Sequence, residues 1–185
     1  MTTLTDPAPK LIGEWSAVLA TRGGVELHVR PTAKEDEPAI RAFFAELGPD
    51  DLRFRFLSPM PRPCDSLYDL LVNVDHVRTE DFLAFVEEDG RTRLVASAML
   101  SCDPDTRKAE VAISVHPAYR NKGIGWSLLD FVARDAEQRG MDVLQSIECR
   151  DNRGALEVEK DLGFEIGFYP DDPHLDLVSK RLGGR

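Results

Sequence analysis

Basic and glycine residues gather in one short stretch near the middle of the chain, where residues 120–125 read RNKGIG. An alternating apolar run, Val111, Ile113 and Val115, precedes this stretch and stops at Pro117, and an apolar pattern of helical period follows it. We therefore expect a strand, a turn and a helix in that order. The first turn of a helix leaves backbone N–H groups without intrahelical partners, and glycines let an anion approach them closely. The spacing predicts a cradle for the pyrophosphate of a phosphate-bearing ligand.

Spacing excludes two other kinds of phosphate-binding loop. A P-loop needs the string G-x-x-x-x-G-K-[ST], which the chain lacks. A dinucleotide fingerprint needs G-x-G-x-x-G, and no third glycine follows Gly125 at the required distance. The pattern that remains is R-x-x-G-x-G.

A carboxylate, Glu110, lies on the strand that leads into this loop. Strand alternation places it on the face opposite Val111, together with the small residues Ala112 and Ser114. An alkyl amine is protonated at neutral pH, with a pKa of about 10.4 in water, and a carboxylate near a small-residue slot could remove that proton. The competing interpretation is a solvated strand glutamate, which is the commoner case for this residue type.

The elements expected along the chain are a strand, helices, three strands, and then a helix, a strand, a helix and a strand. A hairpin is expected within residues 15–30, with Arg22-Gly23-Gly24 as its turn. Further strands are expected over residues 82–87, 93–101, 108–115, 143–149, 163–169 and 175–178, and helices over 36–47, 52–57, 66–74, 123–138 and 152–162. This order predicts an α/β fold with a mixed sheet and helices on its faces. We expect residues 1–12 to be flexible and residues 13–182 to form one domain.

Composition limits the classes of function. The 185 residues are 42% hydrophobic and carry a net charge of −10, which argues against binding to nucleic acid. The acidity would tolerate a cationic acceptor, although it is also a common route to solubility. The three cysteines have no paired spacing, which favours free thiols in a reducing cytoplasm and argues against a zinc site. No apolar stretch approaches the length of a membrane span, so we expect a cytoplasmic protein without membrane contact.

The loop resembles the acyl-CoA binding motif [QR]-x-x-G-x-[GA] of the GNAT superfamily of N-acetyltransferases. A second signature of that superfamily, N-x-x-A followed by L-G-F, is matched by Asn152, Ala155 and residues 162–164. The resemblance extends from about Val25 to Val178. It implies the GNAT fold, whose splayed strand pair holds acyl-CoA, with acetyl-CoA as the acyl donor and no metal.

The resemblance also implies which residues bind the donor. The pantetheine arm would pair with main-chain groups of the strand, the loop and helix start would hold the pyrophosphate, and Asn152 would line the other side. The residues implied are Ile113, Ser114, Val115, Arg120, Asn121, Lys122, Gly123, Ile124, Gly125, Trp126 and Asn152.

A finer resemblance is to the bacterial Pat-type protein lysine acetyltransferases. It rests on residues 23–47 (GGVELHVRPTAKEDEPAIRAFFAEL), on residues 50–56 (DDLRFRF), and on the A-E-V-A string of residues 109–112. The catalytic base of those enzymes is the glutamate of that string, which corresponds to Glu110. This implies transfer of acetyl to a protein lysine by direct attack in a ternary complex, and allows a homodimer. Acetylation of a small amine (an antibiotic, a polyamine or an amino acid) stays open, as does a CoA-sensing module without turnover.

Some positions depart from the pattern or have plainer interpretations. The superfamily often has a tyrosine that protonates the leaving thiolate where this chain has Glu159, which we expect on a solvated helix face, so the proton donor is left open. His116 is expected at the surface and Cys149 as a buried packing residue. Phe54 and Phe56 are expected in the core or along the acceptor slot.

Overall fold

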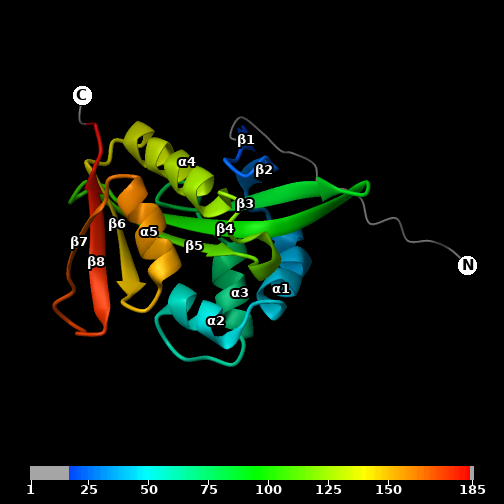
Figure 1. The fold of residues 1–185 in the computed structure, drawn as a ribbon, viewed down its shortest axis with the longest axis horizontal. Helices are drawn as coiled ribbons and strands as arrows, with labels where there is room; N and C mark the ends of the chain where they lie inside the picture. Colours follow the sequence, from blue (N-terminus) through cyan, green and yellow to red (C-terminus); the bar gives the residue numbers. More distant parts are fainter. Residues whose placement is uncertain (1–16, 184–185) are drawn as a thin grey trace, which may run out of the picture.

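A computed structural model describes residues 17–183, which form one eight-stranded sheet (Figure 1). The strand order is β1-β2-β3-β4-β5-β6-β8-β7. Every neighbouring pair is antiparallel except β5 and β6, which run parallel. The strands are β1 (Ala17–Ala20), β2 (Glu26–Pro31), β3 (Thr79–Glu88), β4 (Arg91–Asp103), β5 (Lys108–Val115), β6 (Val143–Cys149), β7 (Glu165–Phe168) and β8 (Leu175–Arg181). The expected mixed α/β sheet is confirmed.

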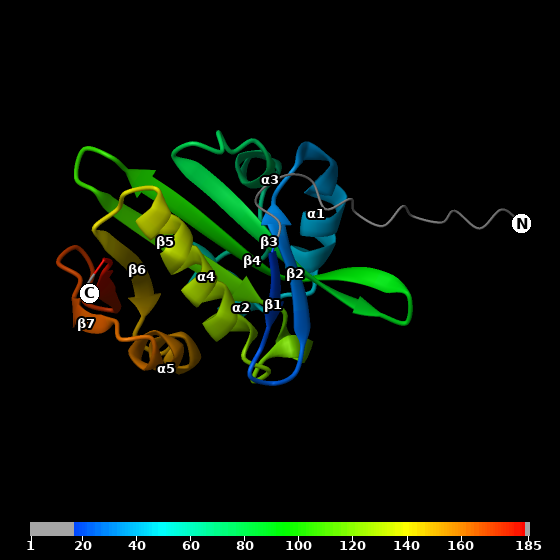
Figure 2. The same ribbon diagram turned by 90° about the horizontal axis from the view of Figure 1, so that it is seen from above.

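Helices cover both faces of the sheet (Figures 1 and 2). They are α1 (Glu37–Ala45), α2 (Pro49–Phe56), α3 (Asp65–Val72), α4 (Ile124–Gln138) and α5 (Arg153–Asp161). Helix α4 packs on one face, where Leu128 and Val132 join a core that includes Phe82. Helices α1 and α3 pack on the other face in a second core around Phe44 and Leu71. The two cores fix the sheet between the helices.

The first helix ends earlier than the sequence pattern indicates. Ile40, Phe43 and Phe44 are buried, as the helical spacing predicts. Helix α1 nevertheless stops at Ala45, two residues before the expected end at residue 47, and Gly48 is the N-cap of α2. The Gly48 backbone is extended, and its N–H donates to Asp51 Oδ2 at 3.0 Å. The capping carboxylate of the next helix therefore decides this boundary.

The feature of the sheet that matters most for function is where β5 and β6 stop pairing. Strand β5 pairs with β4 along its whole length. Its parallel ladder with β6 has three partner pairs and ends at Glu110 and Gln145. Beyond that point β5 turns one edge toward open space, while β6 stays paired with β8. The expected splay of the two strands is present.

Two expectations concern the chain as a whole. Residues 1–12, expected to be flexible, lie outside the described residues, so the proposed domain limits stay a prediction. Among the helices of residues 17–183, none is long and apolar enough to cross a membrane.

Candidate active site

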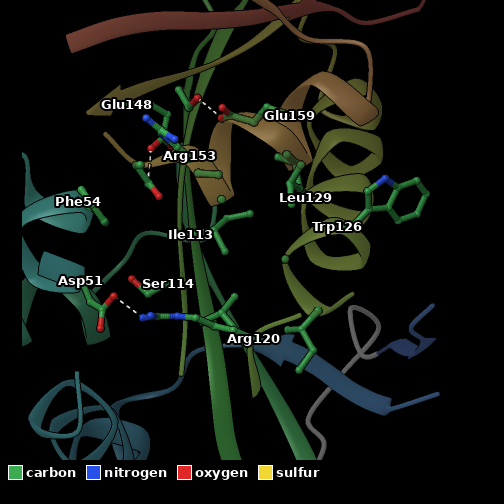
Figure 3. A pocket seen from close by; sticks show the side chains of 18 of the residues that line it. Asp51, Phe54, Ile113, Ser114, Arg120, Trp126, Leu129, Glu148, Arg153 and Glu159 are labelled. Atoms are coloured by element: carbon green, nitrogen blue, oxygen red, sulfur yellow. Dashed lines mark hydrogen bonds and ion pairs between the residues drawn. The ribbon is translucent and has the colours of Figure 1, made fainter. Parts of the chain in front are cut away.

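A cavity of about 490 Å³ lies in the gap between the splayed strands (Figure 3). Its walls come from the second half of β5, the loop after it, the start of α4, the end of β6, and α5. Helix α2 lies along the mouth and contributes Asp51 and Phe54. Figure 3 shows Arg120 and Asp51 toward one end of the cavity and Glu148 and Glu159 toward the other.

The loop end of the cavity is formed by the start of α4. Gly123 caps this helix in the left-handed conformation, with φ of 77°, which favours glycine. Behind it, a Cβ atom would approach the backbone nitrogen of Arg22 at 3.1 Å. Helix α4 then begins at Ile124, and its first-turn N–H groups face the cavity end without intrahelical partners. This end can bind an anion.

The turn between β1 and β2 supports the loop from outside the cavity. The Gly23 N–H donates to the Lys122 carbonyl oxygen at 3.2 Å. A Cβ on Gly23 would lie 2.6 Å from that oxygen, so only glycine allows this approach. The Arg22 guanidinium stacks on the Trp126 ring at 3.8 Å. The expected hairpin thus has a second role, because its turn holds the loop in place.

Two ion pairs fasten α2 across the cavity mouth. The Arg120 guanidinium pairs with Asp51, linking the loop to α2. Arg53 Nη2 lies 2.6 Å from Asp151 Oδ2, linking α2 to the segment before α5. The pairing with Asp51 offsets part of the positive charge that Arg120 brings to the loop.

A smaller cavity of about 220 Å³ adjoins the first on the side of α2. Glu110 lines only this smaller cavity, together with Arg55, Phe56 and Leu57. Five residues line both cavities and mark the place where they meet: Phe54, Val111, Ile113, Glu148 and Asn152. Two ligands, one in each cavity, would therefore come together beside Glu148.

Glu148 was not singled out from the sequence. It lies on β6 and accepts a hydrogen bond from Asn152 Nδ2 at 2.8 Å. Burial, with a contribution from the nearby Glu159 carboxylate, raises the pKa of Glu148 to about 8. A sequence signal was available, since Glu148 is the one charged residue in the strand VLQSIEC, residues 143–149.

The expectation for Glu159 is wrong. Its side chain is not on a solvated helix face but is 4% exposed and lines the larger cavity. Glu159 Oε1 accepts a hydrogen bond from Ser146 Oγ on β6. Burial raises the pKa of this carboxyl to about 7. The nearby residues Glu157 and Lys160 are exposed. Because they are charged, the sequence suggested that the whole helix surface around Glu159 is solvated.

Other expectations can be judged from burial. His116 is 6% exposed and not at the surface, because its Nε2 meets Glu46 Oε2 at 2.8 Å under the packing of Phe43. Cys149 is buried, as expected. Phe54 and Phe56 are half-buried, and both line the smaller cavity.

Comparison with known proteins fits this geometry. The model of the acetyltransferase (GNAT) family matches residues 44–164. The chain belongs to the GNAT family. It is 28% identical over 149 residues to an acetyltransferase of Pseudomonas aeruginosa, and the match covers 80% of each chain. As a member of this family it is an acetyltransferase that acts on an amine with acetyl-CoA.

Solved structures show the same fold. The GNAT domain of PAT from S. lividans has a TM-score of 0.81 at 21% identity, over 91% of this chain and 97% of that one. A ribosomal L7/L12 alpha-N-protein acetyltransferase in complex with coenzyme A has a TM-score of 0.70 at 13% identity, over 90% and 97% of the two chains.

Most residues implied as binding the donor of this GNAT acetyltransferase lie together. Ten of the eleven line the larger cavity, namely Ile113, Ser114, Val115, Arg120, Asn121, Gly123, Ile124, Gly125, Trp126 and Asn152. Lys122 is the exception, because its ammonium lies 4.8 Å from the Tyr119 ring and its carbonyl faces Gly23. Their contacts with acetyl-CoA stay a prediction. The larger cavity thus has a helix N-terminus that can bind an anion at one end and the carboxyls of Glu148 and Glu159 at the other, and Glu148 also lines the smaller cavity.

Proposed function

We propose that this enzyme transfers acetyl from acetyl-CoA to a lysine side chain of a protein, with Glu110 as the general base. One observation carries the proposal. The smaller cavity opens onto the larger one and combines apolar walls with carboxylates, which suits an alkyl chain that ends in an ammonium group.

Different residues of the smaller cavity would contact the methylene stem and the amine of a lysine side chain. Phe54, Phe56 and Ile147 offer apolar surface to the methylene stem of a lysine. Glu110 offers a carboxylate to its amine, and Glu148 offers the oxygens of a carboxyl whose pKa is raised to about 8. A volume of about 220 Å³ accepts one unbranched side chain, while the rest of a protein acceptor would stay outside.

Catalysis would then rest on position and proton removal. Glu110 lines the acceptor cavity and is exposed, so it can take the amine proton and pass it to solvent. The freed amine attacks the thioester carbonyl where the cavities meet. The free edge of β5 supplies main-chain groups there, because alternate N–H groups of Val111–Val115 turn away from β4.

The test is acetyl-CoA turnover, measured as release of free thiol, for wild type and Glu110→Gln. Acceptors would be cytosolic proteins from a lysate and, separately, a panel of small amines. Glu165→Gln, an exposed strand glutamate on β7, is the matched control. Loss of a general base lowers the rate by about 10²–10⁴-fold. Protein-dependent turnover that is lost in Glu110→Gln with CoA binding retained supports the proposal. Unchanged turnover contradicts the role of Glu110.

A second acceptor class, small amines that carry a carboxylate, is favoured by Arg55. Its Nε and Nη2 atoms are buried and have no hydrogen-bond partner within residues 17–183. These two atoms form the edge of a guanidinium that takes a carboxylate side-on. Asp81 and Glu110 already offset the Arg55 charge, so we place this class second. Turnover confined to amino acids in the panel, and lost in Arg55→Met, would move the function to it. CoA binding without turnover on any acceptor would instead indicate a sensing module.

A further inference from the structure

Two carboxyl groups lie on opposite sides of the place where the cavities meet. Glu110 lines only the smaller, acceptor-side cavity, and Glu159 lines only the larger one. Amide formation from an amine and a thioester needs one group that removes a proton and profits from another that supplies one to the leaving sulfur. The two positions match these two needs.

The surroundings of the Glu159 carboxyl favour its protonated form, which can donate a proton. Its Oε1 already accepts the Ser146 Oγ hydrogen, while Oε2 is buried and unpartnered in the part of the chain that the structure describes. An ionised Oε2 in that position would be an uncompensated buried charge, whereas a protonated Oε2 is an O–H donor waiting for an acceptor. The cavity that Glu159 lines is the side from which such an acceptor can arrive.

Glu148 reinforces the protonated state. It lies on β6 two residues beyond Ser146 and interacts electrostatically with Glu159. Two like charges in a buried site disfavour simultaneous ionisation, so the pair retains a proton near neutral pH. Each carboxyl accepts one hydrogen bond, Glu148 from Asn152 Nδ2 and Glu159 from Ser146 Oγ, and burial raises the pKa of both, to about 8 for Glu148 and about 7 for Glu159. Below about pH 7 Glu159 therefore carries the proton that a donor needs.

The leaving sulfur should lie at the same end of the cavity. In CoA the pyrophosphate and the thiol are at opposite ends of the pantetheine arm. The anion site lies at the loop end, beside Arg120, and Figure 3 shows Glu148 and Glu159 at the opposite end. The carbonyl carbon must sit where both cavities meet, so its sulfur points into the larger cavity, on the Glu159 side.

We propose that Glu159 protonates the CoA sulfur as the thioester breaks; this inference rests on the proposed function of the site. The amine nitrogen forms the new N–C bond and loses its proton to Glu110. The C–S bond breaks, its electron pair goes to sulfur, and sulfur takes the proton from Glu159 Oε2. Glu110 is left protonated and Glu159 ionised, and exchange with solvent restores both before the next turnover.

The experiment compares wild type with Glu159→Gln, which keeps the shape and the acceptor for Ser146 but removes the acidic proton. Glu157→Gln, the same change on the exposed face of α5, is the control. We expect kcat to fall at least tenfold in Glu159→Gln, with the KM for acetyl-CoA within twofold of wild type. The fall of wild-type kcat on the alkaline side of its pH profile should be absent in the variant, because an acid must be protonated to act. Unchanged kcat, or a raised KM with kcat unchanged, would overturn the proposal.

Two further readouts keep this test separate from that of the proposed function. Infrared titration of the free protein should show weaker protonated-carboxyl absorption at pH 6 in Glu159→Gln than in wild type or Glu157→Gln, with Glu148 accounting for part of what remains. Equal absorption in all three proteins would overturn the proposal. Slow hydrolysis of acetyl-CoA in the absence of any amine breaks the same C–S bond. If wild type acetylates no acceptor, the proposed function fails, and the hydrolysis rate of Glu159→Gln still decides the role of Glu159.

Discussion

Glu110 and Gln145 are the last partners in the parallel ladder between β5 and β6. The strands part immediately after this pair, so Glu110 lies where the gap between β5 and β6 begins. Ser146, which hydrogen-bonds Glu159, is the next residue along β6. The point at which the sheet opens therefore also brings the acidic residues of the site together.

Binding of CoA in the gap between β5 and β6 should stabilise the folded protein against thermal unfolding. A ligand that binds only the folded protein stabilises it by about 2.7 kcal/mol at a concentration of 100 times its Kd. For a chain of this size that corresponds to a rise in Tm of roughly 5–10 °C. Thermal unfolding with and without CoA measures the shift. Pantetheine, which lacks the pyrophosphate, should give a much smaller one at equal concentration, and an equal shift would contradict the anion site at the loop.

Gly23→Ala should weaken CoA binding although residue 23 does not line the cavity. The added Cβ would lie 2.6 Å from the Lys122 carbonyl oxygen and must displace the loop. We expect the Kd for CoA to rise by about tenfold, equivalent to roughly 1.4 kcal/mol. Calorimetric titration measures this.

Gly24→Ala is the control for that change. Gly24 has φ of 78°, and no other group lies within 4 Å of where its Cβ would be, so the alanine variant carries backbone strain without touching the loop. It should lower Tm and leave the Kd unchanged. Equal loss of affinity in both variants would mean that turn strain, and not contact with Lys122, is responsible.

Asp51→Asn should strengthen CoA binding. Asp51 pairs with Arg120 and so competes with an anion for its guanidinium. Exposed ion pairs contribute about 0.2–1 kcal/mol, so we expect a Kd roughly two- to fivefold lower and more sensitive to salt. Titration at low and high salt measures both effects. Asp50→Asn, which alters a neighbouring exposed carboxylate, should change neither, and an unchanged Kd in Asp51→Asn would contradict the competition.

Glu159→Gln should change how stability depends on pH. The pKa of Glu159 is raised from its usual value to about 7 in the folded state, so the folded protein binds the proton more tightly than the unfolded chain. Wild-type stability from this group is complete below about pH 4.5 and is lost as pH rises to about 7. The variant lacks that loss, so relative to wild type it should gain on the order of 3 kcal/mol between pH 4.5 and pH 8. Urea unfolding at both pH values measures the difference, and a constant difference would contradict the raised pKa.

The sequence predicted the fold closely where one face of an element is apolar. The bounds expected for β5 and β6 are those of the structure; in β5 the alternation of Val111, Ile113 and Val115 with smaller or polar residues is clear. The position of the loop was also predicted from the sequence, because the glycines of RNKGIG, residues 120–125, favour a backbone conformation that other residues rarely adopt. Both patterns depend only on residues that are close in sequence, so they can be recognised without knowing how the rest of the chain packs.

The part of the site that contains Glu148 and Glu159 could not be predicted from the sequence, and the reason is physical. Glu148 and Glu159 are separated from Glu110 by more than thirty residues, and only the splay of β5 from β6 brings them to one cavity. The composition of α5 suggested a solvated face, because Glu157, Lys160 and Asp161 lie within two residues of Glu159. Burial of a carboxyl depends on what packs over it, and periodicity in a charged helix does not reveal that.

The pairing of β6 with β8 has a consequence for how the enzyme is made. Strand β6 carries Ser146 and Glu148, shares only three partner pairs with β5, and shares seven with β8, Leu175–Arg181. A nascent chain that has emerged only as far as α5 contains every residue of both cavities, yet its β6 still lacks its main partner. We therefore expect the cavity wall to become ordered only once β8 can pair with β6, which is later in synthesis than the residues that line the cavity.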